Sequence, residues 1–166
     1  KKVRIFKDSD NSVFTDIHEP TLGWFGSNVA ISSDDTNVRV FIGEGSAKKV
    51  YVYVSPIASA NFTLEHTFSG STNFGFSMYI WKSTNFEYIA IAQKFVSAFV
   101  KFWKRSLTGT TWDTYGPGIH MGKVSTMSMH AVSDTQHVLF FADHSAKRVR
   151  IGLATDIDDA GINYYG

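Results

Sequence analysis

The chain of 166 residues contains no cysteine. A disulfide framework and a thiolate metal site are therefore excluded, whereas the compartment stays open because many secreted repeat proteins also lack cysteine. Charge is almost balanced, with 16 basic and 15 acidic residues, so we expect no affinity for nucleic acid. The longest apolar stretches, such as residues 88–92, are far shorter than the roughly 20 residues of a membrane helix, so we expect no membrane insertion. The chain opens with Lys1 and no apolar signal segment, which indicates a mature or excised product.

Strong helix formers such as Ala, Leu and Glu are sparse, while aromatic residues make up 15% of the chain, and this balance favours β-strands. A short strand that combines basic residues with an alternating pattern recurs four times. Its copies are anchored by Val3, Val50, Val100 and Val149, which are 47, 50 and 49 residues apart. Such regular spacing predicts a structural repeat of about 49 residues.

Other columns keep the same period. An aromatic residue followed by a polar one comes about a dozen residues after the first three anchor valines, and a Phe–Gly pair occurs twice. These columns are Phe14–Thr15, Phe62–Thr63, Trp112–Asp113, Phe25–Gly26 and Phe74–Gly75. Together with a polar turn and an apolar strand, they predict four strands of about five to seven residues in each period.

The expected fold is all-β. Residues 138–142 form a strand that is apolar on both faces, as in a sheet that is covered on both sides. Four-stranded antiparallel sheets that stack radially bury both faces, so we predict a β-propeller with blades of about 49 residues. A β-sandwich or a β-helix is the alternative, but a sandwich has no reason to repeat and β-helix turns are usually shorter.

The columns resemble the FG-GAP repeat of integrin α-chain-type β-propellers. Phe25–Gly26 and Phe74–Gly75 are similar to the Phe–Gly strand of that family, and residues 49–53 are similar to its Val-Tyr-Val-Tyr strand. The third repeat departs from the pattern, with Met121–Gly122 or Val124 in place of Phe–Gly. None of the repeats has the Gly-Ala-Pro motif itself.

The resemblance implies that the Phe–Gly strand is innermost in each blade and that the chain is a single propeller segment of about three and a half blades. Residues 1–20 are then the outer half of one blade, and three blades span 24–69, 73–116 and 121–166. Known propellers have at least four blades, so we expect a segment of a larger propeller or one completed by other subunits.

The family often carries calcium in an Asp-rich loop between its first two strands, because a hard cation needs several carboxylates. The corresponding turns, at residues 33–36, 83–85 and 133–135, are short and poor in carboxylates, so we expect hairpin turns and no cofactor. Two acidic stretches elsewhere are interpreted as solvated turns, with weak calcium binding as the alternative. Their candidate ligands are Asp8, Asp10, Ser12, Asp16, Asp156 and Asp158.

Two pairs of basic residues, Lys48–Lys49 and Lys147–Arg148, share one hairpin position in two repeats. They predict a basic rim that could bind an acidic glycan or a protein, although such residues can also simply keep hairpins soluble. Asn61 begins the one N-glycosylation sequon of the chain, which agrees with the extracellular habit of the family.

Catalytic constellations are not apparent. No nucleophile with a base and no carboxylate pair occurs at a meaningful spacing, and the six histidines are scattered. Residues 106–112 are similar to a sialidase Asp-box, but Leu107 replaces the Asp, and Trp112 is expected to pack as Phe62 does.

We therefore expect a non-enzymatic structural or adhesion module, extracellular or at the cell surface, which makes protein–protein contacts or joins further subunits. The alternative is a carbohydrate-binding or sialidase-like propeller. An enzyme of that type would need convergent carboxylates or an arginine cluster at the centre of the disc.

Overall fold

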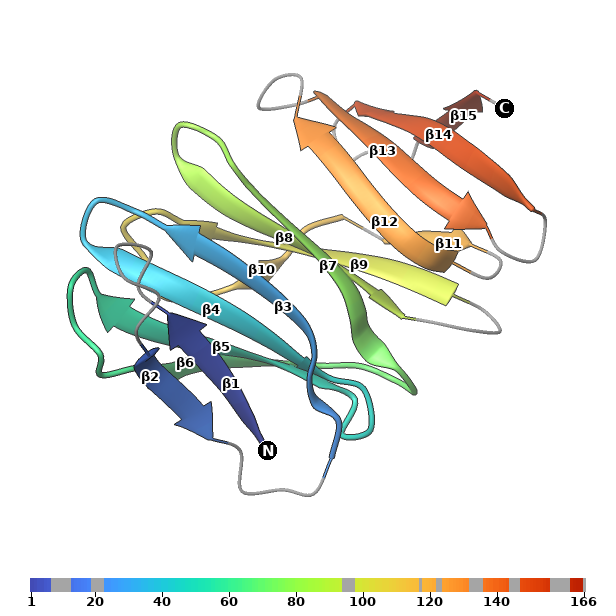
Figure 1. Ribbon diagram of the computed structural model, residues 1–166. Helices are drawn as coiled ribbons and strands as arrows, with labels where there is room; N and C mark the ends of the chain where they lie inside the picture. Colours follow the sequence, from blue (N-terminus) through green and yellow to red (C-terminus); the bar gives the residue numbers. More distant parts are fainter. Residues whose placement is uncertain are drawn as a thin grey trace. The chain divides into compact units, whose positions relative to one another are not determined.

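The computed structural model describes residues 1–6, 13–18, 23–93, 98–116, 118–121, 124–131, 136–143, 147–155 and 162–165. Every regular element within them is a β-strand and the sheets are antiparallel, which confirms the all-β prediction. The chain divides into two compact units, residues 1–75 and 76–166 (Figure 1).

The first unit contains a two-stranded sheet and a four-stranded sheet, and consecutive strands pair in both. The two-stranded sheet consists of β1 (Lys2–Phe6) and β2 (Val13–His18). The four-stranded sheet consists of β3 (Phe25–Ser33), β4 (Asn37–Glu44), β5 (Lys49–Pro56) and β6 (Thr63–Ser69).

The second unit contains two larger sheets, in which consecutive strands again pair, except that β10 and β11 both pair with β9. One consists of β7 (Phe74–Lys82), which begins at the boundary between the units, β8 (Phe86–Gln93), β9 (Ala98–Ser106), β10 (Asp113–Thr114) and β11 (Ile119–Met121). The short strands β10 and β11 follow one another along the same edge of β9. The other sheet consists of β12 (Val124–Ala131), β13 (Gln136–Asp143), β14 (Arg148–Thr155) and β15 (Ile162–Tyr165).

The anchor valines occupy one position in the strand pairings. Val50, Val100 and Val149 each face a small residue across the hairpin, and the partners are Gly43, Ala92 and Ala142. On the other edge, the partners of Val3, Val50 and Val100 are the buried residues Ile17, Phe68 and Ile119. The columns seen in the sequence are therefore columns of paired residues in the sheets.

Each unit has a core between its two sheets. In the first unit, Val3 and Ile5 of β1 pack against a core that includes Val40, Ile42 and Tyr51 of the four-stranded sheet. In the second unit, residues from β7, β8 and β9 pack against the first strand of the last sheet. The members of this core are Trp81, Tyr88, Ala90, Ala92, Val100, Phe102, Tyr115, Ile119, Met127 and Met129. The middle strands β4 and β8 are buried over most of their length on both faces, as predicted for the second strand of the repeat.

The two Phe–Gly pairs share a physical cause. Gly26 and Gly75 have φ angles of 81° and 82°, in the left-handed region that glycine enters without steric cost. A Cβ on Gly26 would come 3.2 Å from Cγ2 of Val3, and a Cβ on Gly75 would come 2.6 Å from Cγ2 of Val50. Each glycine thus lies against the anchor valine of the preceding repeat, so the two columns recur together.

One predicted equivalence is wrong. Phe14 does not correspond to Phe62, because it lies inside β2 as the extra residue of a bulge, whereas Phe62 directly precedes β6. In the next sheet, the counterpart of Phe14 is Glu65, which is the bulge residue beside β5. In the sheet after that, it is Tyr115, which follows the last paired residue of β10. The reason is loop length: six residues lie between the paired residues Phe6 and Val13, and ten lie between Tyr53 and Leu64.

The start of the last repeat also needs a correction. Met121, which the sequence offers together with Val124, pairs with Ala98 and so ends the outer edge of the β7–β11 sheet. Val124 pairs with Asp143 as Phe25 pairs with Glu44, and therefore takes the Phe position of the repeat. The boundary expected between 116 and 121 falls after Met121, because the outer strand of this sheet is interrupted and then continues as β11.

Candidate interaction surfaces

The predicted basic rim comes from two equivalent hairpins, one in each unit. Lys48 and Lys147 end their turns in the left-handed conformation, with φ angles of 60° and 51°. The next residues, Lys49 and Arg148, begin β5 and β14 and lie opposite acidic residues, Glu44 and Asp143. Both hairpins thus close with an acidic residue opposite a basic one, and the rim itself stays a prediction.

Of the predicted calcium ligands, only Asp16 lies within the described residues. Asp8, Asp10, Ser12, Asp156 and Asp158 lie outside them. The Oδ1 atom of Asp16 lies 2.9 Å from Nε of Arg4, and its Oδ2 atom lies 2.6 Å from Nζ of Lys2. Hydrogen bonds from these two cations hold the pKa of Asp16 well below its usual range. A metal ion at this carboxylate would therefore have to displace two positive side chains.

The turns between the first two strands of the repeat are hairpin turns where the structure describes them. The backbone N–H of Asp34 donates to the carbonyl of Asn37 at 2.9 Å, and that of Ser83 donates to Phe86 at 2.8 Å. Oδ1 of Asp34 accepts the backbone N–H groups of Thr36 and Asn37 at 3.0 and 2.8 Å. The third predicted turn, at residues 133–135, lies outside the described part. No group of three metal-ligating His, Asp or Glu side chains occurs among the described residues.

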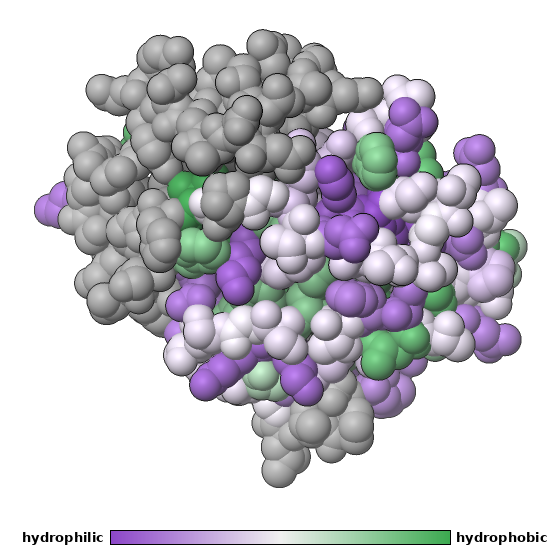
Figure 2. Space-filling view, turned by 180° about the vertical axis from the view of Figure 1, so that it is seen from behind, coloured by the Kyte–Doolittle hydropathy of each residue, from purple (hydrophilic) through white to green (hydrophobic). Residues whose placement is uncertain are grey.

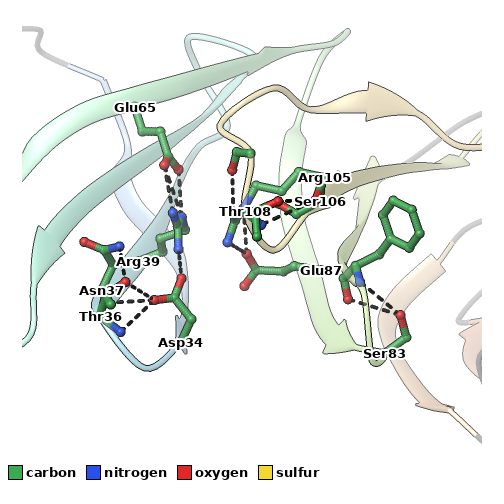
Figure 3. Close-up of polar contacts among 12 residues, drawn as sticks. Asp34, Thr36, Asn37, Arg39, Glu65, Ser83, Glu87, Arg105, Ser106 and Thr108 are labelled. Carbon is green, nitrogen blue, oxygen red and sulfur yellow. Dashed lines mark hydrogen bonds and ion pairs between the residues drawn. The ribbon is translucent and has the colours of Figure 1, made fainter.

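An ion-pair network that the sequence did not reveal joins β4 of the first four-stranded sheet to the outer strand β6 and to the turn between β3 and β4 (Figure 3). Arg39 donates from Nε and Nη2 to the carboxylate of Glu65 at 2.9 and 3.0 Å, and from Nη1 to Asp34 at 2.6 Å. Burial opposes ionisation of Asp34, but the hydrogen bonds from Thr36 and Arg39 outweigh it and lower the pKa. At the equivalent positions of the second unit, Tyr88 and Tyr115 have ring centroids 5.2 Å apart. At this pair of positions, the second strand of the repeat is therefore joined to the bulge of the outer strand by an ion pair in the first unit and by two tyrosine rings in the second unit.

A second ion pair, Glu87 with Arg105, is completely buried (Figure 3). Nε of Arg105 donates to Glu87 at 2.9 Å, and its Nη1 donates to the carbonyls of Ser106 and Gly109 at 3.1 and 2.7 Å. The signal that could have found this pair is the hairpin itself, since Glu87 lies directly opposite Arg105. The equivalent pair in the first unit is Val38 with Ser55. Arg105 therefore fixes the turn that leads to the outer strand, and Ser55 at the equivalent position donates to the carbonyl of Ser59 in its own turn.

Trp112 is buried beneath the guanidinium of Arg105, whose Cζ lies 5.6 Å from the ring centroid. This burial confirms the prediction that the tryptophan of the Asp-box-like segment packs. Like Phe62, it directly precedes an outer strand.

A groove of about 300 Å³ lies in the first unit, with Asn61 of the sequon on its border. Asn61 is exposed in the turn before β6. The groove combines polar and aromatic side chains, and it is lined by Thr15, Asp16, Ile17, His18, Tyr53, Ala60, Asn61 and Phe62.

Exposed apolar side chains gather at two places in the sheets. On the face drawn in Figure 2, hydrophobic residues form separate groups among hydrophilic ones, as is normal for protein surfaces. On β13 and β14, however, Phe140, Val149 and Ile151 are exposed on one face of the sheet, because Phe140 and Ile151 are directly paired. On β3, Val29 and Ile31 are exposed on one face. Such groups mark candidate interaction surfaces.

Comparisons with protein-family models, curated proteins and solved structures find no match to this chain. The described residues include no helix that is long and apolar enough to cross a membrane.

Proposed function

We propose that this chain is a non-enzymatic part of an FG-GAP-like β-propeller, extracellular or at the cell surface, which functions by binding further sheets of its own kind. The three larger sheets each place the anchor valine opposite a small residue, which supports a chain of equivalent blades. The proposed blades are β3–β6, β7–β11 and β12–β15, preceded by β1–β2 as the outer half of another.

The observation that carries this proposal is the apolar face of β13 and β14. Val149 is 63% exposed, whereas the equivalent Val100 of the preceding sheet is 0% exposed. Ile151 and its equivalent Phe102 differ in the same way. Val100 and Phe102 belong to the core that includes Met127 and Met129 of the next sheet. A further first strand of the same type would bury Val149 and Ile151.

Size-exclusion chromatography with light scattering tests the proposal. We expect the chain to self-associate as its concentration rises, since an exposed apolar face seeks cover. Val149→Lys should shift the chain toward the monomer, whereas the matched control Ile57→Lys, which replaces another exposed apolar residue in a turn, should not. A compact and stable monomer at all concentrations would refute the need for further sheets.

The charged residues of the described sheets support a role without catalysis. The side chains of Arg39 and Arg105, which are buried, are already paired with carboxylates that hold strands together. They are committed to the fold rather than to a substrate.

Carbohydrate binding is a second candidate, favoured by the groove that borders Asn61. Tyr53 and Phe62 offer apolar surface there, and Asp16 and His18 offer polar atoms, a combination typical of sites for small polar ligands. A glycan array separates a lectin from a scaffold, since only the lectin would retain specific glycans.

A further inference from the structure

The strand β1 has an edge that carries no strand among the described residues, because it pairs only with β2. The other strands that hold an anchor valine are paired on both edges. They are β5, β9 and β14. An unpaired edge of this kind presents a row of backbone N–H and C=O groups that another strand can use.

Beside this edge, β3 exposes two large apolar side chains. Val29 and Ile31 pair with Ile42 and Val40, so they lie on the face that β1 and β2 cover. The core includes Val40 and Ile42, but Ile31 is 65% exposed. The cover over this face therefore reaches Phe25 at the start of β3 but stops before Ile31.

The second unit shows how the same positions are covered when the neighbouring sheet is complete. Met127 and Met129 are the equivalents of Val29 and Ile31, as their pairing with the second strand shows. Met129 is only 2% exposed, and its core includes residues of β7 and β8. The two-stranded sheet of the first unit has no counterpart of β7 and β8 among the described residues.

We propose that the free edge of β1, together with Val29 and Ile31, is a docking surface for a pair of antiparallel strands that the described residues do not supply. One strand pairs with β1 by β-augmentation, and the other covers Val29 and Ile31. The surface continues the interface that β1 and β2 already make with β3–β6. The proposal rests on the proposed function in one respect, namely that the repeats pack alike.

The three complete sheets specify the chemistry of the strand that pairs with β1. Opposite the anchor valine stands a small residue in every case. The residue before the anchor valine is basic in two of the hairpins, and it faces Glu44 in one and Asp143 in the other. The residue two places after the anchor valine faces Phe41, Ala90 or Phe140 in the three sheets.

The partner strand should therefore place an acidic residue opposite Lys2, a small residue opposite Val3 and an apolar residue opposite Ile5. A second copy of the chain offers no free strand pair of this kind within the described residues. Its first and second strands are β3–β4, β7–β8 and β12–β13, and each pair already belongs to a four- or five-stranded sheet.

The test uses a labelled peptide with the sequence of residues 25–44, which ends in the required apolar, small and acidic residues. We expect saturable 1:1 binding to the full chain by fluorescence anisotropy. Hydrogen exchange of the β1 amides should slow at the same time, because the free edge becomes paired. Ile31→Glu in the chain should weaken binding by about tenfold or more, since the apolar cover of one large side chain is lost.

Two controls keep the result specific. Ile57→Glu replaces an apolar residue of similar exposure in the turn after β5, and should leave binding unchanged. A peptide with Gly43→Trp should not bind, because Val3 requires a small partner. No binding, binding that is equal for both chain variants, or unchanged exchange of β1 would overturn the proposal.

A tethered version guards against a peptide that aggregates by itself. A copy of residues 24–48 placed directly before Lys2 would join the two by the native turn of β4 and β5. It should raise the melting temperature of the first unit, and Ile31→Glu in the original β3 should abolish the gain. An unchanged melting temperature would overturn the proposal, whereas failure of the association test of Val149 would bear only on the other face.

Discussion

Replacement of the buried pair Glu87–Arg105 by its counterparts from the first unit, Val38 and Ser55, gives a strict test of the repeat. Arg105→Ser alone leaves a carboxylate buried without its cation, and Glu87→Val alone leaves a guanidinium without its anion. Each should cost about 3–5 kcal/mol of unfolding free energy. In the double variant no charge remains buried at this site. The new serine at position 105 can donate to Gly109, as Oγ of Ser55 donates to the carbonyl of Ser59 at 3.0 Å.

The double variant should therefore cost only about 1–2 kcal/mol, mainly for the space that the arginine stem leaves. Urea unfolding followed by tryptophan fluorescence measures the cycle, and Trp112 reports locally because it lies under Arg105. Arg4→Ser, which removes an exposed partner of Asp16, serves as the control with a smaller effect. Losses that simply add, within about 0.5 kcal/mol, would refute both the burial argument and the equivalence of the two sites.

Two further predictions concern single positions. Gly75→Ala and Gly26→Ala should each lose about 1–2 kcal/mol of unfolding free energy, because both positions have a positive φ. Val50 lies closer to Gly75 than Val3 does to Gly26, so Gly75→Ala should lose about 1–3 kcal/mol more. Equal losses in thermal unfolding would contradict this. Burial lowers the pKa of His66 despite the nearby Glu65, so protonation favours the unfolded chain. Stability should fall as pH drops below the usual value of 6.5, and urea midpoints at about pH 7.5 and 5.5 should differ less for His66→Gln than for the wild type.

Much of the sheet structure was predictable because it is local in sequence. The anchor valines and their small partners lie a few residues apart across one hairpin, so their period is visible in the chain itself. The same holds for the turn at Asp34, where the side chain and the backbone N–H groups that it accepts are neighbours.

The outer strands were harder to predict because their loops differ. Phe14 was assigned to the wrong column since a shorter connection moves the bulge toward the anchor valine. Met121 was ambiguous because the outer strand beside β9 is split in two. Aromatic columns alone do not reveal either event, since a bulge and an interruption change the pairing without changing composition.

The two exposed apolar faces could not be derived from the sequence. Val149 and Val100 occupy the same column and look alike in the chain, but one is exposed and the other is buried. Ile31 and Met129 raise the same problem on the opposite face. Exposure depends on whether a neighbouring sheet is present, which is a tertiary property. The ion pair of Arg39 with Glu65 was hidden for a related reason, since 26 residues and a bulge separate its partners.

The pairing of consecutive strands has a consequence for how the chain is made. Contacts between strands that are neighbours in sequence close short loops, and such contacts form quickly. The sheet β3–β6 has all its strands once residue 69 has left the ribosome, before the strands of the second unit have emerged from it. The first unit can thus fold during translation, and the nascent chain acquires its sheets in the order in which its codons are read.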